Sequence, residues 1–274
     1  VSGSSINIGG DIESVTDWIA MPESYSYYVD QDQGLGGGLG GLSNSGKAAL
    51  VHALNNVDID MSQFDSNGDG VCDGIILIME GWSSGSKNHF WSFKGSLLPG
   101  EVSSIDPSAT VNQNDEFVIN GKIIRNFIVT TEKMFHSDDE FSLYSQGDIR
   151  PIGTICHEIG HILGLPDLYD TSDNAAPGIG DWGIMGSGNW NNQTSPSIFS
   201  AWSSQRLGVT SVISLDNFHE DFFTINPVNS SNQIYKINIG EDATGEYFLI
   251  ENRTATGSDS YLKDSGMLIW HVDE

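Results

Sequence analysis

The stretch HEIGHILGLPDLYD, His157–Asp170, brings together residue types that bind metal ions. His157 and His161 are four residues apart, so on a helix their rings lie on one face and can share one ion. Glu158 directly follows the first histidine, where a carboxylate lies near the metal's open coordination position without binding the metal. The pattern predicts a zinc site with Glu158 as the catalytic base.

A helix must hold the two histidines in this register. One helical face from Pro151 to Leu163 carries the apolar residues Ile152, Ile155, Ile159, Ile162 and Leu163. Gly164 is expected to end the helix in the left-handed conformation, and Pro166 prevents its continuation. The chain can then turn back and present Asp167 as a third zinc ligand.

A glycine-rich segment downstream, GDWGIMGSGNW, contains Met185. A lone methionine ordinarily fills space in a core. After a helix motif of this kind, Met185 fits a structural methionine turn beneath the metal.

The acidic segment DSNGDGVCD predicts a calcium loop. Calcium requires several oxygen ligands, and this loop offers them at alternate positions. The expected ligands are Asp65, Asn67, Asp69 and Asp73, with the carbonyl group of Val71. The alternative is an ordinary turn rich in Asp, Asn and Gly.

The composition restricts the classes of partner. The 274 residues include 11 Lys and Arg against 37 Asp and Glu, which gives a formal net charge of −26. Such a surface repels nucleic acids and anionic membranes, so we expect neither as a partner. The best apolar run, Gly74–Met79, has the length of a buried strand, and we expect no membrane insertion.

The remaining pattern predicts a mixed α/β protein. Strands are expected at Gly74–Met79 and Lys122–Thr130. A helix is expected from the spacing of Leu50, Ala53, Leu54 and Val57. After Gly208 the alternating segments QIYKINIG, EYFLIEN and GMLIWHV predict strands.

These patterns give an expected organisation of the chain. We expect a catalytic domain with the calcium loop over residues 1–207 and a β-rich segment over residues 208–274. The abrupt ends suggest a piece processed from a longer precursor. Cys72 and Cys156 can form a pair or stay free, since two cysteines do not make a disulfide framework.

Seven segments occur in an order that one family shares. They are MPESYSYYV, FDSNGDGVCDG, HEIGHILGLPDLYD, GDWGIMGSGNW, PSIFSAWSSQRLG, YFLIENR and GMLIWHVDE. On these motifs the chain resembles the immune-inhibitor-A-like secreted bacterial metallopeptidases, which are related to the metzincins. That family commonly has an aspartate at the third ligand position, as Asp167 is here. One departure is Phe93, where relatives tend to have a histidine.

The resemblance implies a metzincin-like α/β (α+β) domain with a twisted mixed sheet, an active-site helix and a β-rich C-terminal segment. It implies a secreted zinc endopeptidase in which Glu158 assists the attack of a zinc-bound water on protein or peptide substrates. One catalytic zinc ion, one or more structural calcium ions and a monomeric state are expected. Two alternatives stay open: a calcium-stabilised adhesion or binding module with a non-catalytic zinc site, and a zinc hydrolase of non-peptide bonds.

Overall fold

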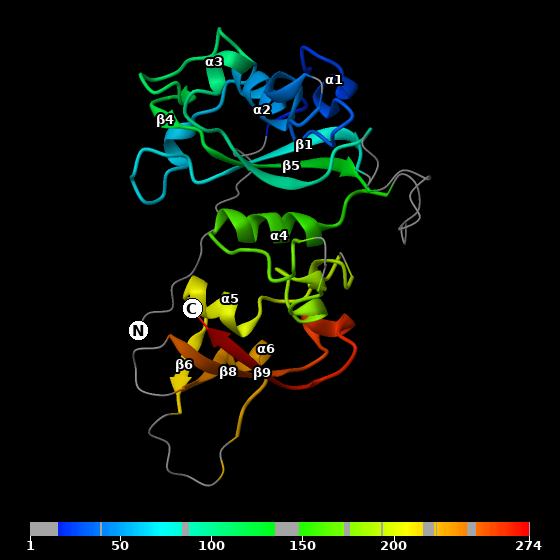
Figure 1. Ribbon diagram of the computed structural model, residues 1–274, viewed down its shortest axis with the longest axis vertical. Helices are drawn as coiled ribbons and strands as arrows, with labels where there is room; N and C mark the ends of the chain where they lie inside the picture. Colours follow the sequence, from blue (N-terminus) through cyan, green and yellow to red (C-terminus); the bar gives the residue numbers. More distant parts are fainter. Residues whose placement is uncertain are drawn as a thin grey trace. The chain divides into compact units, whose positions relative to one another are not determined.

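The computed structural model describes residues 16–38, 40–83, 88–134, 148–172, 176–192, 194–215, 222, 224–239 and 245–273. The described residues form two compact units, one up to Pro151 and the other from Ile152 onward. Each unit combines helices with strands (Figure 1), so the expected mixed α/β class is confirmed. The boundary expected at residue 207 falls inside the second unit. Over the described ranges, no helix has the length and apolar character that crossing a membrane requires.

The first unit is built around a three-stranded sheet in the order β1-β5-β2. β1 runs parallel to β5, and β2 runs antiparallel to it. Leu50 of α2 and Phe127 of β5 are fully buried in the same core, because α2 covers one face of the sheet. The elements are α1 (Tyr25–Val29), η2 (Gly41–Asn44), α2 (Gly46–Asn55), η3 (Met61–Gln63), β1 (Ile75–Trp82), β2 (Phe93–Ser96), α3 (Val102–Ile105), β3 (Val118–Ile119), β4 (Lys122–Ile123) and β5 (Asn126–Lys133).

The single strand expected over Lys122–Thr130 is wrong, because the structure has two strands there. β4 pairs with β3 in a hairpin, whereas β5 begins at Asn126 and pairs with β1 and β2. Asn120 and Gly121 connect β3 to β4 with φ angles of 50° and 77°. Positive φ at both central residues is typical of a tight hairpin turn, and Asn-Gly is the preferred sequence for it.

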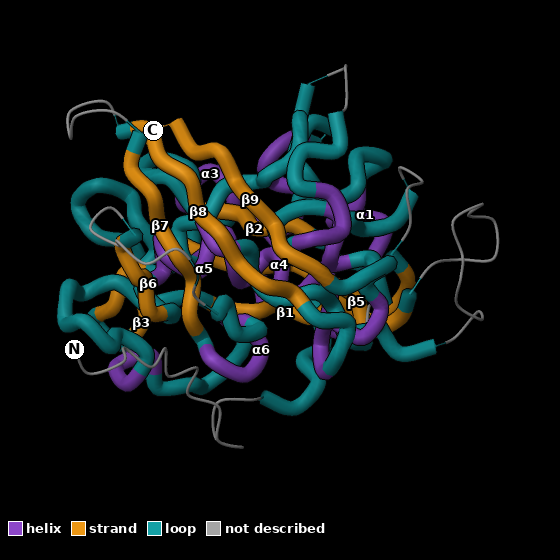
Figure 2. The backbone as a smooth tube through the Cα atoms, turned by 90° about the horizontal axis from the view of Figure 1, so that it is seen from below, coloured by secondary structure: helices purple, strands orange, loops and turns teal. Residues whose placement is uncertain are grey.

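The second unit contains a four-stranded sheet in the order β6-β7-β8-β9. β6 runs parallel to β7, and the other neighbours are antiparallel; β7, β8 and β9 lie side by side in Figure 2. The strands expected after Gly208 are present, and two short helical segments interrupt them. The elements are α4 (Ile152–Ile162), η4 (Gly180–Trp182), η5 (Ser187–Asn189), α5 (Ala201–Leu207), β6 (Ser211–Ser214), α6 (Val228–Ser231), β7 (Gln233–Asn238), β8 (Glu246–Arg253), η6 (Gly257–Tyr261) and β9 (Gly266–Asp273).

Two apolar clusters hold the second unit together. The sheet core consists of Ala201, Val228, Ile234, Tyr247 and Leu249. The turn core consists of Leu165, Ile184 and Met185. Trp202 of α5 packs against both clusters. The packing of the C-terminal strands is therefore continuous with the packing around Met185.

Both cysteines are free thiols. Cys72 is buried in the first unit, and Cys156 is half-buried on α4 of the second unit. Burial raises the pKa of each thiol. Neither thiol therefore ionises readily at neutral pH.

Candidate metal centre

Helix α4 carries the two histidines and the glutamate, as their spacing predicts. His157 and Glu158 are almost fully buried, with 5% and 7% of their surface exposed, and His161 is partly exposed. Residues four apart on a helix lie one turn above each other. The two imidazole rings accordingly meet edge to face, with 4.7 Å between their centroids.

The helix ends as the glycine predicts. Gly164 has φ 90°, and its N–H donates to the carbonyl of His161. The N–H of Leu165 donates to the carbonyl of Gly160, which completes a Schellman motif. This reversal directs the chain back toward the histidines and brings Asp167 to them.

Three side chains converge on one point. The Nε2 atoms of His157 and His161 lie 3.1 Å apart. Oδ1 of Asp167 lies 3.1 Å from Nε2 of His157 and 3.3 Å from Nε2 of His161. In the described part of the chain, this is the one group of at least three His, Cys, Asp or Glu side chains whose ligand atoms lie within 4.8 Å of one another.

Backbone carbonyls determine which ring nitrogens face this point. Nδ1 of His157 lies 2.8 Å from the carbonyl oxygen of Ile184, and Nδ1 of His161 lies 2.8 Å from that of Leu165. A carbonyl oxygen can only accept, so each Nδ1 carries the hydrogen. Each neutral ring then points an Nε2 lone pair at its neighbours, which is the arrangement of metal-bound histidines.

Three lone pairs that converge on one point are the arrangement that binds a cation. Oδ1 of Asp167 is buried and has no hydrogen-bond donor among the described residues. Burial lowers the pKa of His157, and the nearby His161 lowers it further, so a proton on this ring is disfavoured. Without a cation, an oxygen and two nitrogens would face one another with unshared electrons. His157, His161 and Asp167 therefore form a candidate site for a metal ion.

Met185 lies fully buried in the turn core. Its carbonyl accepts a hydrogen bond from the N–H of Leu168, the residue after Asp167, at 2.8 Å. The preceding residue, Ile184, supplies the carbonyl that orients His157. The turn therefore positions one histidine and the segment that carries the candidate third ligand, Asp167.

Comparison with known proteins identifies the segment around this centre. Residues 129–209 match the family described as immune inhibitor A peptidase M6, catalytic domain. Over this segment, the chain is similar to the immune inhibitor A peptidases. The resemblance given by the motifs is therefore confirmed for the part of the chain that carries the metal cluster.

Two curated relatives match part of the chain. Each is a pre-pro-metalloprotease PrtV of Vibrio cholerae serotype O1, from strain M66-2 and from strain ATCC 39315 / El Tor Inaba N16961. Both are 43% identical to it over 67 residues, which are 22% of this chain and 7% of the relative. The aligned segment is thus a small part of these much longer proteins.

Tyr169 lies at the candidate metal centre, and the sequence patterns did not single it out. Its ring stacks on that of His157, with 6.3 Å between the centroids and 22° between the planes. Burial, and next the charge of Asp167, raise the pKa of Tyr169 to about 12. The hydroxyl group therefore stays protonated at neutral pH and keeps a hydrogen to donate. The sequence did offer one signal for Tyr169: it is an aromatic residue two positions after the candidate ligand Asp167.

Hydrogen bonds within the acidic loop hold its conformation. The N–H of Asp69 donates to Oδ1 of Asp65 and to Oδ1 of Asn67, both at 3.0 Å. The N–H of Val71 donates to Oδ1 of Asp69 at 2.8 Å. Oδ2 of Asp73 accepts from the backbone of the same loop at 3.0 Å. The three carboxylates do not form a cluster of the kind found at the metal centre.

A lysine forms an ion pair with one carboxylate of this loop. Nζ of Lys122 lies 2.6 Å from Oδ2 of Asp65, whose side chain is 1% exposed. This contact is the main cause of a lowered pKa for Asp65. The candidate calcium ligand Asp65 is therefore already paired with one positive charge, that of Lys122.

Phe93, the departure from the family pattern, begins β2 and is partly buried against the core of the first unit. Its ring meets that of Phe127 edge to face, with 6.2 Å between the centroids. A phenylalanine ring binds no metal and transfers no proton. At this position the chain uses the side chain for packing.

Proposed function

We propose that the chain is a zinc endopeptidase of the metzincin-related type. The proposal is carried by the three-residue cluster of His157, His161 and Asp167. A tetrahedral ion with bonds of about 2.0–2.1 Å separates its ligand atoms by about 3.3 Å. The observed separations of 3.1, 3.1 and 3.3 Å match that spacing. Two nitrogens and one carboxylate oxygen are a donor set that zinc accepts.

Three protein ligands are the number found in catalytic zinc sites, which keep a fourth position for water or substrate. When bound, zinc would lower the pKa of a water molecule and polarise the carbonyl group of the substrate. The carboxylate of Asp167 adds negative charge, which reduces both effects relative to a third histidine. The histidine rings are held in place by the carbonyls of Ile184 and Leu165.

Glu158 is the proposed general base. It follows His157 on α4 and is 7% exposed, so its carboxylate is largely withdrawn from bulk water. Glu158 accepts a proton from the attacking water and then donates it to the nitrogen of the leaving amine. The protonated hydroxyl group of Tyr169 is a further donor close to His157.

Two further features belong to this proposal. Met185 fits the methionine turn of the metzincin-related peptidases, since it is buried beneath the ligands and hydrogen-bonded to the loop of the third ligand. The substrates are proteins or peptides, as the names of the family and of the two relatives suggest. We also propose that the protein is secreted and acts as a monomer; its net charge of −26 suits that setting.

Calcium is the proposed second ion. Oxygen atoms of Asp65, Asn67, Asp69 and Asp73 and the carbonyl of Val71 lie in one short loop and would supply hard ligands. Lys122 would compete with calcium for Asp65, because its ammonium group already pairs with Oδ2 of this carboxylate. Calcium in this loop would stabilise the first unit and take no part in the reaction.

Cleavage of an unfolded protein by the parent chain and by Glu158→Gln, both loaded with zinc, tests the function. The parent should cleave, and the variant should lose about 10²–10⁴-fold in rate while keeping its zinc, because only the proton acceptor is removed. If the parent keeps zinc and cleaves nothing, the binding-module alternative replaces the peptidase. Cleavage of esters in place of peptides would favour the second alternative, a zinc hydrolase of non-peptide bonds.

A further inference from the structure

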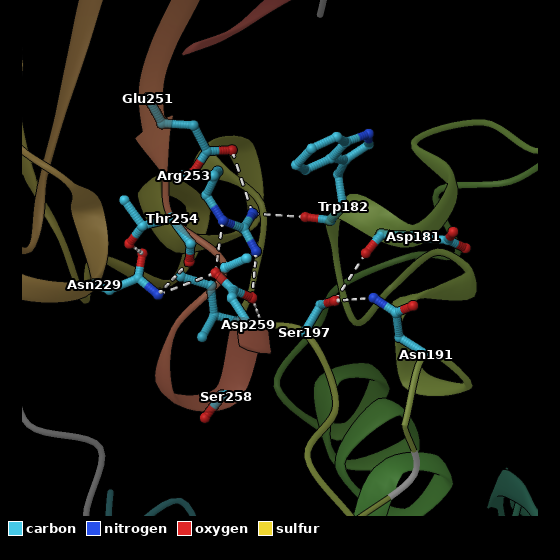
Figure 3. Close-up of polar contacts among 12 residues, drawn as sticks. Asp181, Trp182, Asn191, Ser197, Asn229, Glu251, Arg253, Thr254, Ser258 and Asp259 are labelled. Carbon is cyan, nitrogen blue, oxygen red and sulfur yellow. Dashed lines mark hydrogen bonds and ion pairs between the residues drawn. The ribbon is translucent and has the colours of Figure 1, made fainter. Parts of the chain in front are cut away.

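A buried ionic cluster lies beside the methionine turn (Figure 3). Arg253 of β8 is fully buried, and its Nε and Nη2 atoms donate to the two oxygens of Asp259 at 2.8 and 2.7 Å. Its Nη1 atom donates to the carbonyl of Trp182 at 2.6 Å. The same Nη1 lies 3.6 Å from Oε1 of Glu251. One guanidinium therefore joins β8, η6 and the segment that leads into the turn.

The acidic members of the cluster hold the start of α5. Asp259 accepts from the N–H of Ile198 at 3.1 Å, and from Nδ2 of Asn229 at 3.2 Å. Glu251 accepts from the N–H of Ala201 at 3.3 Å, and from Nε1 of Trp270 at 2.8 Å. Glu251 and Asp259 are both fully buried, so these bonds are shielded from water.

Two routes lead from Arg253 to the metal centre. In the first, Arg253 holds the carbonyl of Trp182, two residues before Ile184. In the second, Asp259 holds the N–H of Ile198, and the carbonyl of Ile198 accepts the N–H of Ile184 at 3.3 Å. Both routes end at Ile184, whose carbonyl accepts the hydrogen of His157.

A cluster of this kind is costly to bury. Removing charges from water costs several kcal/mol per ion, and well-packed apolar residues often give equal or greater stability. Stability alone therefore does not require a charged cluster here. Its directional bonds to Trp182 and Ile198 supply what an apolar side chain cannot, namely a fixed orientation of the backbone.

We propose that Arg253 is a positioning residue for the metal centre. It fixes the carbonyl of Ile184 through Trp182 and through Asp259, and so fixes the ring of His157 toward the ion. The inference rests on the proposed function, because it requires a metal at His157, His161 and Asp167. If Arg253 has this role, strand β8 helps to position the metal ligands.

The test compares metal binding in four forms of the chain. Arg253→Lys keeps the charge but cannot bind Asp259 in two places and Trp182 at once. The double variant Arg253→Met, Asp259→Leu replaces the ion pair with apolar groups. Leu249→Ala, in the sheet core on the same strand, lowers stability without touching the cluster. The readouts are zinc affinity by competition with a chelator, the visible spectrum of the cobalt form and the melting temperature.

Loss of a residue that orients a metal ligand typically weakens metal binding 10–100-fold. Both cluster variants should show a loss in that range and a changed cobalt spectrum. Leu249→Ala should keep the zinc affinity and spectrum of the parent, despite a lower melting temperature. If Arg253→Lys does not fold, the double variant gives the same comparison.

Three outcomes separate the inference from the proposed function. Parent-like zinc affinity and cobalt spectrum in a folded cluster variant would overturn the positioning role alone. An equal loss in Leu249→Ala would also overturn it, because general loosening would then explain the effect. Absence of a tetrahedral cobalt spectrum in the parent would overturn the proposed function itself.

Discussion

A Cβ atom added at Gly160 would lie 2.3 Å from the Sδ atom of Met185. Met185 is fully buried, so its side chain has no open space to enter. The absence of a side chain at position 160 therefore lets the methionine turn lie directly against the helix that carries His157 and His161.

Gly160→Ala should lower the free energy of unfolding by about 1–3 kcal/mol, the usual cost of overpacking a core. Helix propensity acts in the opposite direction, by about 1 kcal/mol in favour of alanine. Unfolding in urea measures the balance. Gly266→Ala is the matched control, since its Cβ would meet nothing within 4 Å. A Gly160→Ala variant at least as stable as the parent would contradict the contact with Met185.

Asp167→Ala should weaken zinc binding by more than the 10–100-fold loss that is typical of an outer-shell partner, because a direct ligand disappears. Zinc content after dialysis against a chelator measures the effect. Asp170→Ala is the control, since that carboxylate accepts from the N–H of Ser172 and not from the metal centre. Full zinc content in Asp167→Ala would rule out the aspartate as a ligand.

Glu251→Gln should remove a dependence of stability on pH. Burial raises the pKa of Glu251, although Arg253 opposes the shift. The folded chain therefore holds this proton more tightly than the unfolded chain, whose glutamates titrate near about 4.3. The stabilising effect is complete below that pH and is lost as the pH rises through the folded-state pKa.

The measurement is the difference in unfolding free energy between pH 4 and pH 7. The parent should lose more stability over this interval than Glu251→Gln. Glu80→Gln, an exposed glutamate on β1, should behave like the parent. Identical pH profiles for the parent and Glu251→Gln would show that this carboxyl group is not perturbed.

Calcium should raise the melting temperature of the parent chain, and a calcium chelator should lower it without removing zinc. Asp65→Ala should abolish the calcium response, because this side chain is a proposed ligand. Asp106→Ala changes an acidic side chain of the same unit that binds Ser108 and Asn55. That variant should keep the response. If calcium does not change the melting temperature of the parent chain, the loop is an ordinary turn and not a calcium site.

The convergence of side chains at the candidate metal centre was predictable because its determinants are local. The two histidines, the helix and its end at Gly164 all follow from spacing within a few residues. The Asn120–Gly121 turn predicts the β3–β4 hairpin, a signal that the long apolar run KIIRNFIVT obscured.

The ionic cluster was not predictable from the pattern of β8. Tyr247 and Leu249 face inward, and Glu251 and Arg253 continue on the same face and are fully buried. Charged residues are almost never fully buried unless they are paired. The partners Trp182, Ile198 and Asp259 are distant in sequence or contribute backbone atoms, so no local pattern indicates the pairing.

The position of Arg253 in the chain has a consequence for biosynthesis. A ribosome adds about 5–20 residues per second, so His157 and His161 are made several seconds before β8 and η6. If Arg253 and Asp259 set the turn that orients His157, a nascent chain ending before β8 should bind cobalt weakly. On the proposed function, the growing polypeptide would then pass through its most exposed stage before its metal site is complete. It would not cleave unfinished copies of itself during that time.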